Sequence, residues 1–344
     1  MPSLAVRVGP RLIKTCHVYA LHTIPLECDV YAAGDYPSAS PVFLYFHSGG
    51  LVTGSRACVP PWLVQVCFRN KWPLISASYR LLPQARASGL LEDARAAYAF
   101  ARKWGSPEDA AAERKVIVGG GSAGFFMASL TAHHFSPSPI ALMSITGITT
   151  FRHRFFNSSV LLTPEPITEA QMANHLSSPV SVGTTSFNNP QVFHPDKLRP
   201  DGTKNTEFSF GTGPISIGGG DENVDEFPRG CLYDYYLHRN EFLGLVGEID
   251  PGYEWAKVDD AASKDRLAAW PPTTIIQGDA DDDVDLAVSA HMAECLGEDK
   301  AKFFLAEGQA HRYEATRFLE DDVGGMGAVR RAVANLEHDV ARSA

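Results

Sequence analysis

The chain has 344 residues and a formal net charge of −10, with 44% hydrophobic and 20% charged residues. This composition is typical of a folded globular protein, and the acidic balance without any run of Lys or Arg argues against nucleic-acid binding. No stretch approaches the roughly 20 apolar residues of a membrane span, and the start MPSLAVRVGPRLIK lacks the apolar core of a signal peptide.

The first elements along the chain predict an antiparallel hairpin. Two apolar, β-branched runs, residues 15–23 and 25–33, are joined tightly at Ile24–Pro25. After the turn-rich segment GDYPSASP, expected strands and helices alternate. The strands are expected at 42–47, 72–80, 115–118, 139–146, 271–278 and 301–308, and the helices near 60–70, 91–104, 124–134, 285–297 and 326–340. This alternation predicts an α/β fold with a doubly wound, mostly parallel sheet.

The alternation lapses between residues 147 and 268. Within this stretch, residues 177–222 are dense in Ser, Pro, Asn, Gly and Thr and follow no sustained period. A long irregular segment in a compact protein is usually a lid or binding loop, or else disordered, and the interspersed aromatic residues favour a lid. We therefore expect residues 1–146 and 269–344 to form the core, with 147–268 as an inserted cap or lid. The aromatic residues are Phe187, Phe193, Phe208 and Phe210.

The stretch KVIVGGGSAGFFMA, residues 115–128, fits two motifs. Gly119, Gly121 and Gly124 match the G-x-G-x-x-G turn of dinucleotide-binding folds, which requires a carboxylate about 20 residues further on. No Asp or Glu occurs from 114 through 164, so we reject the dinucleotide and expect no cofactor. Gly120, Ser122 and Gly124 match G-x-S-x-G, the strand-turn-helix elbow that exposes a nucleophilic serine. Ser122 is therefore the candidate nucleophile.

A serine nucleophile needs backbone N–H donors for the oxyanion that forms when it attacks a carbonyl. The residue after the nucleophile, Ala123, supplies one donor in such elbows, and a Gly-rich loop after an earlier strand supplies the others. The loop in YFHSGGLVTGS follows the strand expected at 42–47, and it contains Gly49 and Gly50. We expect Gly49, Gly50 and Ala123 to form the oxyanion hole.

The base and the acid of such a site follow the serine in the order acid, then histidine. Asp281, in the loop after the strand expected at 271–278, is the best candidate acid, with Asp279 and Asp283 as alternatives. His311 follows the next strand and is the candidate base, whereas His291 lies within an expected helix and is a weaker one.

These blocks together resemble the hormone-sensitive-lipase-like (fold-3) esterase and lipase family of α/β-hydrolases. FHSGG resembles the family's H-G-G-G box, GGSAGF its G-D-S-A-G-G elbow, and the YRLLPQ to LEDA segment its Y-R-L-x-P-E and D-A motifs. The chain departs from the family pattern at Ser48, Gln84, Gly121 and Phe125. The resemblance implies hydrolysis of a carboxylic ester through an acyl-enzyme by Ser122, Asp281 and His311, without a metal or organic cofactor.

The substrate is expected to be a small, largely apolar ester, lactone or thioester. Aromatic residues of the insertion are either an acyl pocket or the core of the lid, and Ser48 is expected to reach into the pocket. The residues predicted to bind substrate are Ser48, Phe125, Phe151, Phe155 and Tyr233, with Phe156, Tyr235 and Tyr236 as further aromatic candidates.

Two other functions remain open at this stage. A biosynthetic enzyme of secondary metabolism would use the same residues for cyclisation, dehydration or product release. A non-catalytic small-molecule receptor would usually have lost a member of the triad, and here every member has a candidate. The sequence leaves the oligomeric state open, a homodimer included.

The six cysteines are scattered through the chain, without a C-x-x-C motif. We expect reduced thiols in a cytoplasmic protein rather than a disulfide framework, and no metal site. The cysteines are Cys16, Cys28, Cys58, Cys67, Cys231 and Cys295.

Overall fold

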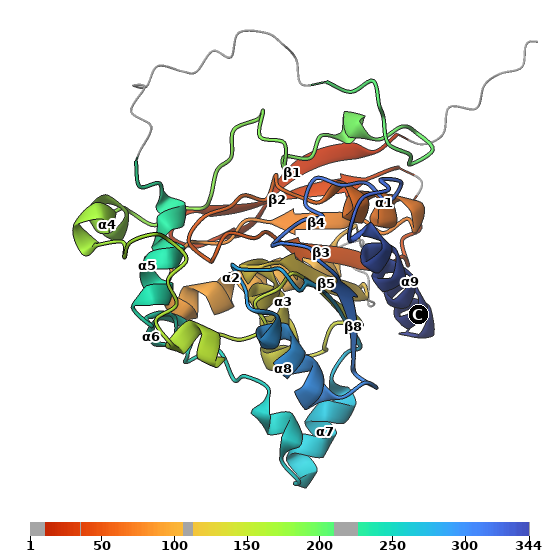
Figure 1. The fold of residues 1–344 in the computed structure, drawn as a ribbon. Coiled ribbons are helices and arrows are strands. Elements are labelled where there is room, and N and C mark those ends of the chain that lie inside the picture. The colour runs from red at the N-terminus through yellow and green to blue at the C-terminus, as the bar shows by residue number, and fades with distance from the viewer. Residues whose placement is uncertain (1–10, 35, 106–112, 210–225, 344) are drawn as a thin grey trace, which may run out of the picture.

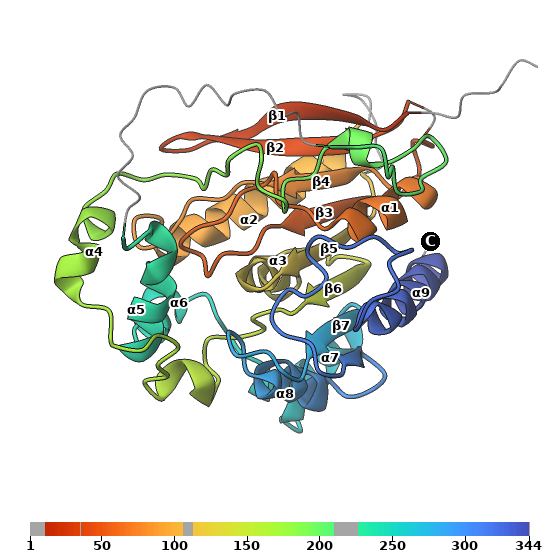
Figure 2. The same cartoon turned by 45° about the horizontal axis from the view of Figure 1, so that its top comes forward.

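The computed structural model describes residues 11–34, 36–105, 113–209 and 226–343 (Figure 1). Its centre is an eight-stranded sheet in the order β1-β2-β4-β3-β5-β6-β7-β8 (Figure 2). The predicted doubly wound α/β fold is thereby confirmed. The strands are β1 (Ile13–Leu21), β2 (Pro25–Ala32), β3 (Val42–Phe46), β4 (Leu74–Ala77), β5 (Val116–Gly121), β6 (Ala141–Ile145), β7 (Thr273–Gly278) and β8 (Ala301–Ala306).

The sheet is antiparallel at one end and parallel elsewhere. β1 pairs antiparallel with β2, as the hairpin pattern predicts, and β2 pairs antiparallel with β4. From β4 onward every neighbouring pair is parallel. Strands β3 to β7 are buried along their whole length, which explains why their sequences are continuous apolar runs rather than alternating ones.

Helices cover both faces of the sheet. Helices α1 (Pro61–Arg69) and α9 (Met326–Ser343) pack on one face, whereas α2 (Arg86–Lys103), α3 (Ala123–His134) and α8 (Leu286–Leu296) pack on the other. The C-terminal α9 shows how the sequence achieves this. Most of its buried side chains recur every three or four residues and form one apolar stripe, while most of the exposed positions are polar. The stripe comprises Met326, Val329, Ala332, Val333, Leu336 and Val340.

A long segment of short helices separates β6 from β7, where the regular alternation of the sequence lapses. Figure 1 shows α4, α5 and α6 grouped beside the sheet, with α7 further along the molecule. Within 177–209, the structure has one 3-10 turn and otherwise irregular chain. Phe210 lies outside the described residues. The elements of the segment are η1 (Arg154–Asn157), α4 (Glu169–Leu176), η2 (Pro195–Lys197), η3 (Arg229–Cys231), α5 (Leu232–His238), α6 (Phe242–Val246), η4 (Glu254–Lys257) and α7 (Ala261–Ala269).

Arg229 fastens this segment to the core. Its guanidinium donates to the carbonyl oxygens of Val52 and Leu82, at 2.8 and 2.7 Å, and to the side-chain oxygen of Gln84 at 2.7 Å. A further hydrogen bond reaches the hydroxyl of Ser178 within the segment at 2.9 Å. One planar side chain thus joins two loops of the core to two parts of the insertion.

Gln84 completes this junction from the core side. Its amide nitrogen donates to the carbonyl oxygens of His175 and Leu176, at 2.8 and 3.2 Å, where α4 ends. Its amide oxygen accepts from Arg229. Gln84 therefore acts as donor and acceptor at once, between two stretches of the segment.

Two further expectations concern disulfide bonds and membrane-spanning helices. All six cysteines are free thiols, as the sequence predicts. Among the described residues, no helix combines the length and the apolar character required to cross a bilayer.

Candidate active site

The predicted triad residues and the glycine loop lie at one edge of the sheet. Ser122 follows β5, the loop with Asp281 follows β7, and His311 lies beyond β8. Gly49 and Gly50 follow β3. Because these strands are parallel, their carboxyl ends lie at the same edge, where ligands bind in open α/β sheets.

Ser122 has a backbone conformation that serine rarely adopts, with φ 50° and ψ −126°. The residues two positions before and after Ser122 must be glycines. A Cβ on Gly120 would lie 2.1 Å from the carbonyl carbon of Gly124. A Cβ on Gly124 would lie 2.1 Å from the carbonyl oxygen of Phe46. The sharp turn between β5 and α3 therefore requires the G-x-S-x-G pattern.

Three side chains form a hydrogen-bonded chain at this edge. The Nε2 atom of His311 lies 3.0 Å from Oγ of Ser122, and its Nδ1 atom lies 2.8 Å from Oδ2 of Asp281. When Nδ1 carries the proton and donates it to Asp281, the lone pair of Nε2 faces the serine hydroxyl. This tautomer allows the imidazole to accept the hydroxyl proton of Ser122.

Asp281 is the carboxylate that reaches His311 among the three candidates. Its side chain is fully buried and also accepts hydrogen bonds from the amide of Gln277 at 2.6 Å and from the backbone N–H of Val284 at 3.0 Å. Asp279 instead accepts from the backbone of Gly308. Asp281 is thereby held rigidly against the imidazole, on a loop that the backbone bond from Ala280 to Gln309 ties to the histidine loop.

The loop after β3 lines the same pocket as the serine. Gly49 and Gly50 have positive φ values of 122° and 62°, and a Cβ on Gly49 would lie 2.3 Å from the carbonyl oxygen of Thr53. Among the described residues, the N–H groups of Gly49, Gly50 and Ala123 donate to no other atom. Free N–H donors at the start of a helix favour a negative charge, which suits an oxyanion.

A pocket of about 380 Å³ opens above Ser122 and His311. Tyr233 of α5 forms one wall: its ring lies against Gly50, and its hydroxyl donates to the carbonyl oxygen of Asp283 at 2.7 Å. The insertion thus contacts the glycine loop and the acid loop at the same time. The lining residues are Gly49, Gly50, Thr53, Ser122, Gln191, Gly230, Tyr233, Asp234, Asp283, His311 and Arg312.

Comparisons with known proteins agree with this architecture. Residues 43–190 match a family model described as alpha/beta hydrolase fold. An alpha/beta hydrolase superfamily protein from Enterococcus faecalis has a similar structure, with a TM-score of 0.61 at 15% identity, over 95% of this chain and 97% of that one. This chain has the α/β-hydrolase fold.

Curated proteins that this chain resembles over part of its length include a lipase and a carboxylic ester hydrolase. Lipase 2 of Moraxella sp. is 33% identical over 89 residues, which are 26% of this chain and 20% of that protein. Carboxylic ester hydrolase LipN of Mycobacterium tuberculosis is 34% identical over 86 residues, 25% of this chain and 23% of that protein. The matched segments therefore span about a fifth of the relatives' own length.

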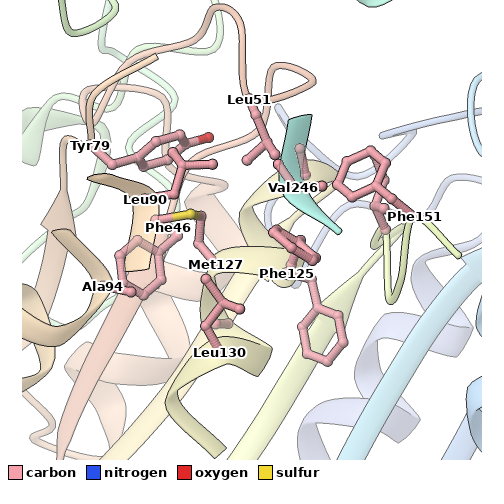
Figure 3. Packing of buried hydrophobic residues seen from close by; sticks show 14 of the residues in the cluster. Phe46, Leu51, Tyr79, Leu90, Ala94, Phe125, Met127, Leu130, Phe151 and Val246 are labelled. Carbon is pink, nitrogen blue, oxygen red and sulfur yellow. The ribbon is translucent and has the colours of Figure 1, made fainter. Parts of the chain in front are cut away.

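Three phenylalanines predicted to bind substrate lie away from the pocket, contrary to the expectation. Phe125 and Phe151 are fully buried among core side chains (Figure 3), and Phe155 is nearly so. The ring of Phe151 stacks on Phe242 at 4.6 Å between centroids. These rings hold the base of the insertion against α3, so their apolar character serves packing, and they do not line the pocket. Tyr235 and Tyr236 are likewise core residues.

Ser48 also departs from its prediction. It is buried and does not line the pocket, and its carbonyl oxygen accepts a hydrogen bond from Nδ1 of His47 at 2.8 Å. The residue that replaces the first glycine of the box therefore points into the protein. Of the five predicted substrate contacts, only Tyr233 lines the pocket.

Several residues that line the pocket were not predicted from the sequence. Thr53, Gln191, Gly230, Asp234 and Arg312 share no motif with the nucleophile. Arg312 could have been found from its position next to His311. Gln191 gave no signal, because it lies in the irregular stretch of the insertion, where it accepts a hydrogen bond from Arg312 at 3.1 Å.

Buried histidines are expected to lower the stability of this protein in mild acid. Burial lowers the pKa of His47, which stacks on Tyr79, to about 4, against the hydrogen bond to Ser48 that opposes the shift. Burial also lowers the pKa of His133 well below its usual range. Below about pH 6.5 these histidines bind protons in the unfolded chain but not in the folded protein. Each buried histidine should therefore lower the free energy of unfolding by about 2 kcal/mol when the pH falls from 7 to 5.

Urea unfolding at pH 7 and pH 5 measures this loss. The H47Q variant should lose less stability than the wild type over this interval, whereas H338Q, which changes an exposed histidine on α9, should behave as the wild type. A wild-type loss below about 1 kcal/mol would contradict the assignment of neutral buried imidazoles.

Proposed function

We propose that this protein is a serine hydrolase that cleaves a carboxylic ester, lactone or thioester of a small molecule through an acyl-enzyme. The observation that carries the proposal is the alignment of Ser122, His311 and Asp281, with distances of 3.0 and 2.8 Å along the chain of hydrogen bonds. Relatives named as a lipase and as a carboxylic ester hydrolase support ester chemistry.

The proposed mechanism follows from the donor and acceptor atoms. His311 takes the proton from Ser122 as the serine oxygen attacks the carbonyl carbon, and Asp281 stabilises the imidazolium that forms. The protonated ring then gives its proton to the leaving oxygen or sulfur, which breaks the bond and leaves Ser122 acylated. Water, deprotonated by His311, attacks the acyl group and releases the acid.

The negative charge of the tetrahedral intermediate would be stabilised by Gly49, Gly50 and Ala123. Their N–H groups lie at the loop after β3 and at the start of α3, without another acceptor among the described residues. Donors fixed in advance stabilise the transition state without reorganisation, and loss of one commonly costs about 3–4 kcal/mol of barrier.

Residues 147–268 are proposed to act as the cap over this site. Gln191, Gly230, Tyr233 and Asp234 come from this segment and line the pocket together with residues of the core. The bonds of Arg229 to both parts support a cap that remains attached to the core. The pocket volume of about 380 Å³ suits a small acyl or alcohol group.

The proposal is tested by turnover of short-chain p-nitrophenyl esters and by labelling with a fluorophosphonate. We expect ester hydrolysis, and mass spectrometry should locate the phosphonyl group on Ser122. Labelling without turnover of any ester would contradict hydrolysis and favour an intramolecular transformation on the same residues. A folded protein that neither turns over esters nor becomes labelled would contradict catalysis by Ser122 altogether and favour a receptor.

A further inference from the structure

A second group of reactive side chains lies away from Ser122, where the insertion meets α8. Glu254 lies on η4, and His291 and Cys295 lie four residues apart on α8, so that both face the same side of that helix. One ligand atom from each of the three lies within 4.8 Å of the others. Carboxylate, imidazole and thiolate are the three side-chain ligands that proteins use for zinc.

Glu254 and Cys295 both approach the same ring nitrogen of His291. The Nε2 atom of His291 lies 2.9 Å from Oε1 of Glu254 and 3.6 Å from Sγ of Cys295. A ring nitrogen carries at most one proton, so it cannot donate to the carboxylate and to the sulfur at once. A cation placed between the three atoms would be bound by the lone pairs of all of them.

The two distances from the histidine nitrogen are close to those around a tetrahedral ion. With Zn–N and Zn–S bonds of ordinary length, tetrahedral geometry separates the nitrogen and the sulfur by about 3.6 Å. The observed separation between His291 and Cys295 is 3.6 Å. The nitrogen and the carboxylate oxygen would lie about 3.3 Å apart in the same geometry, so Glu254, at 2.9 Å and with a side chain that is 70% exposed, would have to withdraw only slightly.

We propose that Glu254, His291 and Cys295 bind a zinc ion in this protein. The fourth position would be taken by water, because Glu254 and His291 line a separate cavity of about 510 Å³ that also contains His153. Zinc binding displaces the thiol proton of Cys295. The exposed ammonium of Lys257 is paired with Glu294 at 3.0 Å and also interacts with Cys295, so it would have to turn away from the sulfur when the ion binds.

The ion would link two parts of the chain that are far apart in sequence. Glu254 belongs to the segment between β6 and β7, whereas α8 follows the loop that holds Asp281. A metal bridge would therefore fix the end of the insertion to the core and stabilise the folded protein when bound. The expectation that the chain has no metal site is replaced by this proposal. The signal was present in HMAEC, where histidine and cysteine are spaced four residues apart.

The site is tested by titrating the reduced protein with Co²⁺. The absorption spectrum of bound Co²⁺ depends on the ligands that hold it. Binding through Cys295 should produce a thiolate-to-cobalt charge-transfer band in the near ultraviolet and visible bands typical of tetrahedral cobalt, and Zn²⁺ should abolish both. The C295S variant should lose the charge-transfer band, and E254Q should bind Co²⁺ at least tenfold more weakly. The C16S variant, which changes an exposed cysteine outside the cluster, should retain the full spectrum.

Thermal unfolding supplies a second measurement. Zn²⁺ should raise the Tm of the wild type and of C16S but not that of C295S, and a chelator should reverse the rise. Wild-type protein without a charge-transfer band, or a band that persists in C295S, would overturn the proposal. Neither readout requires ester hydrolysis, so failure of the zinc site is distinguishable from failure of the proposed hydrolase.

Discussion

Replacing Ser122 with alanine is expected to lower kcat for p-nitrophenyl ester hydrolysis by about 10⁶-fold, which is the typical effect of losing the nucleophile of a serine hydrolase. The variant should also no longer react with fluorophosphonates. The reason is local: Ser122 supplies the only hydroxyl within reach of Nε2 of His311 among the described residues, at 3.0 Å. The oxyanion donors would remain in S122A, so any residual rate reports their contribution and that of binding.

The matched control is S158A, which removes a hydroxyl from an exposed serine at the end of η1. It should retain wild-type kcat, KM and labelling. Circular dichroism and urea unfolding should show that S122A is folded. A folded S122A with more than about a tenth of wild-type kcat would show that another residue carries the reaction.

Replacing Asp93 with alanine is expected to destabilise the fold by about 3–5 kcal/mol, which is a large share of the stability of a typical domain. Asp93 is fully buried in α2, and it accepts hydrogen bonds from the backbone N–H and from the guanidinium of Arg80, at 2.8 and 2.7 Å. His22 contacts the same carboxylate at 2.9 Å. Without the carboxylate, the nearly buried guanidinium of Arg80 would lack its main counterion.

The control for this prediction is E92Q, which changes the second carboxylate that pairs with Arg80. Because the side chain of Glu92 is 62% exposed, its removal should cost no more than about 1 kcal/mol. Urea unfolding with linear extrapolation measures both variants. Similar losses of unfolding free energy in D93A and E92Q would show that the buried ion pair stabilises the fold no more than the exposed one.

The core of the fold was predictable because its elements have strong local patterns. Fully buried parallel strands read as apolar runs, and α9 reads as a helix with one apolar stripe. The candidate nucleophile was predictable for a related reason, since the turn at Ser122 tolerates only glycine at Gly120 and Gly124. Arg80 and Asp93 match motifs of the resembled family, and the structure accounts for them as a buried ion pair.

The insertion was much less predictable. Its aromatic residues give no periodic signal, and sequence alone could not decide between a pocket and a core. Phe151 packs against Phe242 and Phe126 from two other parts of the chain, so its position depends on contacts between residues about 90 and 25 positions away. The choice of Asp281 over its neighbours likewise depends on loop geometry, because four carboxylates lie within five residues.

The junction at Gln84 has a consequence for protein engineering. The resembled family usually carries glutamate at this position, and a carboxylate cannot donate to the carbonyl oxygens of His175 and Leu176 as the amide does. The core of the protein and its insertion are therefore matched to each other at this side chain, beside the bonds of Arg229. A chimera that carries the insertion of a different α/β-hydrolase on the core of this protein would also need residue 84 to be exchanged.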